Sequence, residues 1–159
     1  NVYNLLRQIY SKKFIMIGKG LNKKSMAYVG NVSSFIYNRI YNKESGLNIY
    51  NYVDKPDLTI NDLLTTIEKK LNFKLLKISL PKWLGIFLAY LIDIIAFISN
   101  KKFSISSVRV KKFCATTQFD SKKAMKVFKP PYTIKEGLNK TLDYEFLNSD
   151  KDDILFYSE

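Results

Sequence analysis

Histidine is missing from this chain of 159 residues, and cysteine occurs once, at Cys114. A single thiol cannot form a disulfide within the chain, and a zinc site of the Cys/His kind is excluded as well. Without histidine there is also no histidine acid or base to activate a serine or cysteine nucleophile. One free thiol is compatible with a reducing compartment, so we expect a cytoplasmic location.

Arginine is almost as scarce, although the net charge is +12: only three of the 26 basic residues are Arg, and the other 23 are Lys. A basic chain invites a nucleic-acid reading, but the side chain that grips phosphates and guanine edges with two parallel bonds is Arg. Lys, Asn, Ile, Tyr and Phe are abundant together, as AT-rich codons would make them. We therefore expect no nucleic-acid partner.

Several catalytic motifs are also missing. The chain has no P-loop and no Tyr-x-x-x-Lys pair, and its "GKGLNK" stretch only imitates the start of a dinucleotide fingerprint. Gly18 and Gly20 are present there, but Lys23 stands where the third glycine belongs and no long helix opens. Judged by its own residues, the chain lacks a catalytic centre and is better suited to binding.

The chain begins without an initiator Met, and its first residues, "NVYNLLRQIY", already have the apolar spacing of a helix. We expect it to be a piece of a longer polypeptide. At 47% hydrophobic residues it can bury a core, and no linker long enough to divide it is visible. The tail 149–159 is polar and is expected to fray.

Periodicity and capping residues predict an α/β or α+β fold with several helices around short strands. The expected helices are 2–12, 31–45 (capped by Asn31 and ended by Gly46), 60–71 (Thr59–Asp62 capping box), 83–98, 107–115 (capped by Ser106), 121–128 (capped by Asp120) and 134–148 (Thr133–Glu136 capping box). The expected strands are 14–17, 25–29, 47–54, 74–81 and 116–119.

The segment 83–98, "WLGIFLAYLIDIIAFI", is apolar nearly all round. Its 16 residues are short for a membrane span, and it carries Asp93. It is interpreted as a buried or partner-facing helix; the alternative is a helix lying in a membrane interface.

Two cations are candidates for binding an anion. Lys24 directly precedes a short extended run, and Arg109 lies on the first turns of a later helix with Lys111 and Lys112 close by. Together they could clamp a diphosphate through charge-assisted hydrogen bonds. The alternative is that both are ordinary solvated surface charges.

Six stretches, in this order and spacing, resemble the C-terminal half of the extended short-chain dehydrogenase/reductase family, the NAD-dependent epimerases and dehydratases of nucleotide sugars. The stretches are "NVYNLL", "IMIGKG", "NKKSMAYVGNV", "NYVDKPDLT", "FDSKKA" and "PPYTIKEGLNKT". The resemblance covers residues 1–148, which it identifies as the substrate-binding part. It implies an N-terminal Rossmann half that binds NAD, carries the Tyr-x-x-x-Lys pair and is missing from this chain.

The resemblance also implies roles for single residues in binding a nucleotide sugar. Asn1 matches an asparagine near the sugar diphosphate, and Ile15, Met16 and Ile17 match the strand along the nucleobase. Lys24 and Arg109 match two arginines that contact the diphosphate. The lysine at position 24 keeps the positive charge but cannot form the two parallel hydrogen bonds of a guanidinium group. Asn31, where many relatives have Asp, is expected to cap its helix.

The activity that the resemblance implies is that of a UDP-sugar 4-epimerase, an isomerase that serves polysaccharide biosynthesis, with this fragment alone inactive. A 4-ketoreductase or a dehydratase of the same family remains an alternative, as does a non-enzymatic basic domain that binds anionic membrane or nucleic acid. The expected partners are a UDP-sugar or other nucleotide sugar, the missing Rossmann half, and a second copy in a homodimer. NAD is the expected cofactor.

Overall fold

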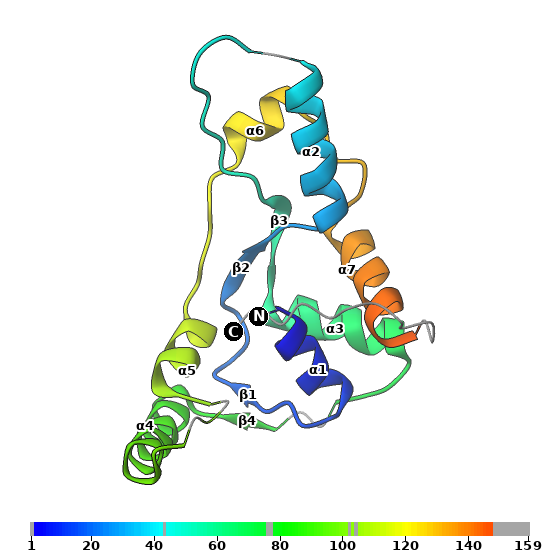
Figure 1. Cartoon of the computed structure of the whole chain (residues 1–159). Coiled ribbons are helices and arrows are strands. Elements are labelled where there is room, and N and C mark those ends of the chain that lie inside the picture. The colour runs from blue at the N-terminus through cyan, green and yellow to red at the C-terminus, as the bar shows by residue number, and fades with distance from the viewer. Residues whose placement is uncertain (1, 43, 76–77, 102, 104, 148–159) are drawn as a thin grey trace.

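A computed structural model describes residues 2–42, 44–75, 78–101, 103 and 105–147 (Figure 1). The helices are α1 (Val2–Tyr10), α2 (Val29–Tyr41), α3 (Ile60–Leu71), α4 (Lys82–Ser99), α5 (Ser107–Cys114), α6 (Lys122–Val127) and α7 (Ile134–Leu142), the last continued by the π-helical turn η1 (Asp143–Leu147). The strands are β1 (Met16–Ile17), β2 (Lys23–Met26), β3 (Asp54–Thr59) and β4 (Ser79–Leu80). The expected tail 149–159 and Asn1 lie outside the described residues.

The strands form two small sheets. β1 pairs with β4 in parallel, and β2 pairs with β3 antiparallel, with a register shift between Lys24 and Met26. In Figure 1 the β2–β3 pair crosses the middle of the molecule, with α2 at one end and the β1–β4 pair at the other. The expected mixture of several helices and short strands is confirmed.

The apolar core lies where α1, α3 and α7 meet. Pairs of apolar residues spaced three or four apart on each helix fall on one face and are fully or nearly buried: Leu6 and Ile9, Leu63 and Ile67, Leu138 and Leu142. Burying each such side chain contributes about 1.5–3 kcal/mol. This cluster anchors α3, and with it β3 and the paired strand β2.

Three helix starts follow the predicted capping. At α3 the Thr59 hydroxyl accepts the Asp62 N–H (3.0 Å), and the Asp62 carboxylate accepts the Thr59 N–H (3.0 Å). Thr133 and Glu136 make the same reciprocal pair at α7. Ser106 caps α5 as expected. These local bonds fix where α3 and α7 begin, independently of their tertiary packing.

The predicted cap at Asn31 is wrong. α2 begins at Val29, and the N–H of the preceding Tyr28 is bound by the Asp54 carboxylate at 2.7 Å. Asn31 lies inside the first turn, fully buried, where its amide donates to Asp54 Oδ1 (2.9 Å) and to the Tyr132 carbonyl (2.8 Å). A carboxylate from β3, distant in the sequence, therefore binds the N-terminus of α2 in place of a local cap.

Other boundaries also differ from the prediction. α2 ends at Tyr41, and Gly46 (φ 75°) lies in the following loop. The predicted strand 47–54 is wrong: residues 47–53 are not a strand, and β3 begins only at Asp54. Leu47 (90% exposed) and Ile49 (72%) are not covered by any other described residues. Asp120 accepts the Lys122 N–H (2.8 Å) but stands one residue ahead of Ser121, the residue that precedes α6.

Candidate functional site

An extended segment, 115–119, lies against β2 and joins it to the end of α5. The Thr117 N–H donates to the Lys23 carbonyl (2.9 Å), and the Ser25 N–H donates to the Thr117 carbonyl (2.8 Å). Thr117 and Lys24 therefore form an isolated parallel β-bridge. The predicted strand 116–119 is present only as this one bridge. The pairing fixes the C-terminal end of α5 beside β2.

Lys24 points along this junction. Its ammonium donates to the carbonyls of Lys112 (2.7 Å) and Ala115 (2.6 Å) and to the Thr117 hydroxyl (3.4 Å). The C-terminal carbonyls of a helix carry partial negative charge, so an ammonium is favourable there. Partial burial lowers the pKa of Lys24, and the nearby Cys114 thiol works against that shift. The structure therefore places all three ammonium donors on protein oxygens, and the predicted contact with a diphosphate stays a prediction.

Asn22 assists Lys24 and was not singled out from the sequence. Its amide nitrogen lies 2.7 Å from the Phe113 carbonyl and 3.4 Å from the Ala115 carbonyl. Side chains from two positions of the 22–24 segment thus satisfy the carbonyls that end α5. No local pattern marks Asn22, because its partners lie more than ninety positions later in the chain.

Arg109 stands on the first turn of α5 with its side chain exposed. Its N–H donates to the Ser106 hydroxyl (3.3 Å). Of its two neighbours in the chain, Val110 is buried and Val108 is 57% exposed. The Asp93 carboxylate of α4 accepts the Ser107 N–H (3.1 Å), so the start of α5 already has an acidic partner and offers an external anion less attraction than the sequence suggested.

The two predicted cations both meet α5: Arg109 belongs to this helix, whereas Lys24 belongs to β2 and binds carbonyls at the end of the helix. Arg109 and Lys112 are three residues apart and therefore share a face of α5, and the Lys24 ammonium is bonded to the Lys112 carbonyl. Lys82, at the start of α4, is close enough to lower the pKa of Cys114, although burial of the thiol dominates and raises it. The α5 basic cluster, defined as Lys24, Lys82, Arg109, Lys111 and Lys112, gathers positive charge around eight helical residues.

β1 meets α4 and α5 at Ile17. The Cys114 thiol contacts the Ile17 carbonyl (3.7 Å), and a Cβ on Gly85 would lie 2.6 Å from the Ile17 side chain, so α4 approaches β1 closely. Of the residues predicted to lie along a nucleobase, Ile15 is half exposed, Met16 is buried and Ile17 is partly buried. The structure brings Ile17 next to α5 and turns Met16 into the interior.

The carboxylate of Asp57 connects β2, β3 and the 115–119 segment through hydrogen bonds. Its carboxylate accepts bonds from Ser25 (2.6 Å), Lys55 (2.8 Å) and Gln118 (2.8 Å). Burial alone would raise the pKa of Asp57, but these donors outweigh it and lower the pKa to about 2. The carboxylate is thus ionised at neutral pH and holds three segments in register.

The turn that imitates a dinucleotide fingerprint has a packing explanation. Gly18 and Gly20 both have positive φ (80° and 67°), which glycine adopts at little cost. A Cβ on Gly20 would lie 2.2 Å from Asn61 Oδ1, and the Asn61 amide donates to the Lys19 carbonyl (3.0 Å). The turn is therefore packed against the start of α3, and it leads into β2 instead of a helix.

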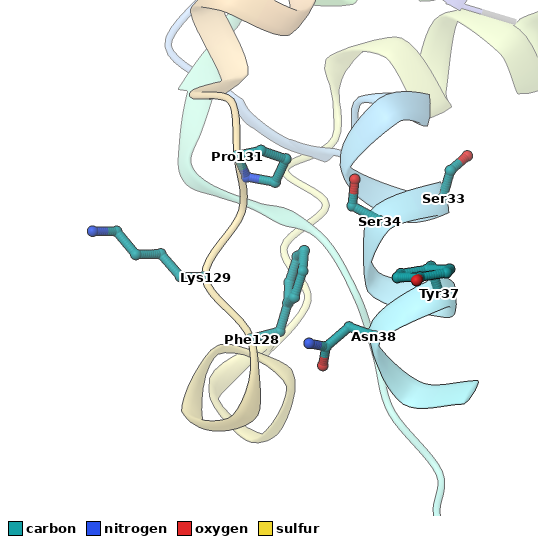
Figure 2. A pocket seen from close by; sticks show the side chains of 7 residues that line it. All are labelled: Ser33, Ser34, Tyr37, Asn38, Phe128, Lys129 and Pro131. Atoms are coloured by element: carbon teal, nitrogen blue, oxygen red, sulfur yellow. The ribbon is translucent and has the colours of Figure 1, made fainter. Parts of the chain in front are cut away.

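A shallow groove of about 530 Å³ opens between α2 and the segment 128–131 (Figure 2). Its lining side chains are Ser33, Ser34, Tyr37, Asn38, Phe128, Lys129 and Pro131. None of the predicted site residues lines it. The groove is therefore separate from the α5 basic cluster.

The chain was compared with known proteins by family, by sequence and by structure. No family model matches the chain. N-acetyl-alpha-D-glucosaminyl-diphospho-ditrans,octacis-undecaprenol 4-epimerase from Escherichia coli O157:H7 is 53% identical over 160 residues, covering 100% of this chain. The chain spans about half the length of that relative (48%).

The similar structure is dTDP-glucose 4,6-dehydratase from Bacillus anthracis str. Ames, solved in complex with NAD. The TM-score is 0.54 at 16% sequence identity, over 89% of this chain and 37% of the dehydratase chain. At this identity the likeness concerns the fold, and it agrees with the short strands and several helices expected from the sequence.

Proposed function

We propose that the chain belongs to the extended short-chain dehydrogenase/reductase family, corresponds to its C-terminal part, and forms the substrate-binding half of an NAD-dependent 4-epimerase acting on a sugar diphosphate. The observation that carries the proposal is 53% identity along the whole chain with a protein named as a 4-epimerase. The α5 basic cluster supports it, since a diphosphate needs cations to bind.

The division of labour follows from which residues are present. NAD bound by another part of the full-length protein would supply the hydride acceptor and donor for chemistry at C4 of the sugar. The described residues do not fit NAD, because the Gly18–Gly20 turn is packed against Asn61 and opens no helix. Cofactor binding and the Tyr-x-x-x-Lys pair are therefore assigned to a Rossmann half outside this chain. The present chain would hold the substrate so that C4 faces that half.

Two classes of sugar diphosphate remain as substrates. The expected UDP-sugar places a nucleoside on the far phosphate, where Ile15 and Ile17 would lie beside the base. The relative's name instead specifies a polyprenol on the diphosphate. Both classes share the group that Arg109 is proposed to bind, so the proposal rests on the diphosphate and leaves the second substituent to experiment. A cytoplasmic location and a homodimer of the full-length protein are part of the same proposal.

The test uses the full-length protein that contains this chain. It is incubated with NAD and either UDP-N-acetylglucosamine or N-acetylglucosaminyl-diphospho-polyprenol, and inversion at C4 is read from the released sugar. We expect turnover with at least one of the two, and none when the 159-residue chain is used alone. Absence of C4 inversion with both substrates contradicts the proposal, and turnover by the isolated chain contradicts the division of labour.

A further inference from the structure

The helix α4 has two unlike faces. Its inner face is made of small residues: Gly85 and Ala89 are buried, and Asp93 on the same side accepts the Ser107 N–H of α5 (3.1 Å). These positions are spaced by four, so they line up along one side of α4. On this side Asp93 binds the start of α5, and Gly85 lies close to Ile17 of β1. The single acidic residue of α4 is thereby directed toward α5.

The outer face of α4, defined as Trp83, Phe87, Leu91, Ile94, Phe97 and Ile98, is apolar and exposed. At about 100° per residue these six positions fall within an arc of roughly 120°. Exposure is 71% at Trp83, 88% at Phe97 and 78% at Ile98, so the face is open along the whole helix. Figure 1 shows α4 at the outer edge of the molecule, beside α5 and the β1–β4 pair.

Positive charge borders this face. Between residues 82 and 114 the chain has six Lys or Arg and one acidic residue, Asp93. Lys111 of α5 lies over the Tyr90 ring at the border of the outer face (4.8 Å from the ring centre), and its ammonium donates to the Tyr90 hydroxyl. Lys82, Lys101 and Lys112 are also exposed. An apolar stripe with an aromatic end and a lysine border is the pattern of a helix that lies in a membrane interface.

We propose that the outer face of α4 and the lysines of α5 dock on the surface of a bilayer that contains anionic lipid. The charge complements such lipids, whereas the centre of a protein–protein interface is depleted of lysine. In length and composition α4 could also cross a membrane. Spanning is disfavoured, because Asp93 of α4 would enter the hydrocarbon together with Arg109 and two lysines of α5, which is attached to the inner face of α4.

Docking would have a consequence for the substrate, and this step rests on the proposed function. Arg109 stands on α5, directly beside the docked helix. It would then lie near the level of the lipid headgroups. A diphosphate attached to a polyprenol embedded in the bilayer is presented at that same level.

The experiment measures vesicle binding by the full-length protein, without turnover, so that an inactive enzyme does not affect the result. Sedimentation is compared for vesicles of phosphatidylcholine alone and of phosphatidylcholine mixed with phosphatidylglycerol. We expect binding to the mixed vesicles that weakens as salt is added. The double change Phe97→Asp and Ile98→Asp should reduce it at least about tenfold, and Lys111→Glu with Lys112→Glu should reduce it similarly.

A matched control is available at the other end of the molecule. Leu47 is 90% exposed and belongs to the segment that follows α2, far from α4 in Figure 1, so Leu47→Asp should leave vesicle binding unchanged. Because Phe97 and Ile98 are exposed, their replacement should not change the melting temperature. Quenching of Trp83 fluorescence by brominated lipid, judged against Trp83→Phe, gives a second readout.

Three results would overturn the proposal. They are absence of binding to the mixed vesicles, equal loss in the Leu47→Asp control, and a Trp83 that neither lipid nor aqueous quencher reaches. The last result would mean that another part of the full-length chain, or a second copy of it, covers α4.

Discussion

The helices α3 and α4 show that composition does not decide which helix is buried. α3 has 12 residues, of which about half are polar or charged, yet Ile60, Leu63 and Ile67 are at most 2% exposed. α4 has 18 residues and is apolar almost throughout, but only Gly85 and Ala89 are buried. The two helices differ in the elements that surround them. α3 turns one apolar stripe toward α1 and α7, whereas the described residues cover α4 only on the side of Gly85 and Ala89.

The largest expected effect is a difference in stability between a substitution in α3 and a substitution in α4. Ile67→Ala in α3 removes a side chain with 0% exposure and should lower the free energy of unfolding by about 2–5 kcal/mol. Phe97→Ala in α4 should change it by less than about 0.5 kcal/mol in solution. Chemical denaturation of the full-length protein measures both. Similar losses for the two variants would mean that α4 is covered and that the contrast is false.

A buried polar network should matter nearly as much as the apolar core. Asp54 is 2% exposed and accepts bonds from the Tyr28 N–H, the Asn31 amide and the Tyr52 hydroxyl. Asp54→Ala leaves these donors without an acceptor and should cost about 3 kcal/mol. The exposed Asn51 is the control: Asn51→Ala should be nearly neutral. A loss below 1 kcal/mol, roughly the value of one ordinary hydrogen bond, would show that water replaces Asp54.

The hydrogen bonds of Asp57 should make stability depend on pH. Its pKa is about 2 in the folded chain, below the ordinary value of an aspartate, so its contribution is complete above about pH 4 and is lost as the pH falls toward 2. We expect a loss of about 1–2 kcal/mol across this window, allowing for partial solvent screening. Asp57→Asn should abolish that part of the acid dependence. If the free energy of unfolding falls with decreasing pH equally in Asp57→Asn and in the wild type, the hydrogen bonds of Asp57 do not contribute to stability as described.

The smallest effect concerns the end of α5. Lys24→Met removes the bonds to the Lys112 and Ala115 carbonyls and should destabilise the junction by about 1 kcal/mol. Hydrogen exchange should become faster at the amides of residues 115–117, and hardly at all in α3. Lys23→Met, at the exposed neighbouring position, is the control. If hydrogen exchange is unchanged in Lys24→Met, the bonds of Lys24 to α5 do not stabilise the junction, and its ammonium would be available for the diphosphate contact that the resemblance implies.

What the sequence predicts well here is local. The capping boxes at Thr59 and Thr133, the cap at Ser106 and the existence of α4 all depend on residues within one or two turns, and the structure confirms them. The prediction that Asn31 caps α2 was wrong because the partners of its side chain, Asp54 and Tyr132, lie 23 and 101 positions away in the sequence. A side chain with good capping chemistry was bound elsewhere by a contact that no local pattern contains.

The site was only partly predictable for the same reason. Arg109 could be singled out as a candidate binding residue because arginine is rare in this chain. The structure places it on α5 near the start of the helix, as expected. Neither the acceptors of Lys24 nor the acidic partner of Ser107 could be inferred, since each joins segments that meet only after folding. The exposure of α4 was equally hidden, because a helix that is apolar all round is usually buried.

The central claim is that this chain binds the diphosphate of the substrate through α5, and Arg109 tests it most directly. The affinity of the full-length protein is measured by calorimetry for a UDP-sugar and for a short-chain polyprenyl diphospho-sugar, with Arg7→Ala on α1 as the matched control. For whichever ligand binds, Arg109→Ala should weaken the affinity ten- to hundredfold, roughly 1.5–3 kcal/mol, and Arg109→Lys should restore part of it. Affinity for NAD and the Arg7→Ala variant should be unaffected; an unchanged affinity for the diphospho-sugar in Arg109→Ala would contradict the account.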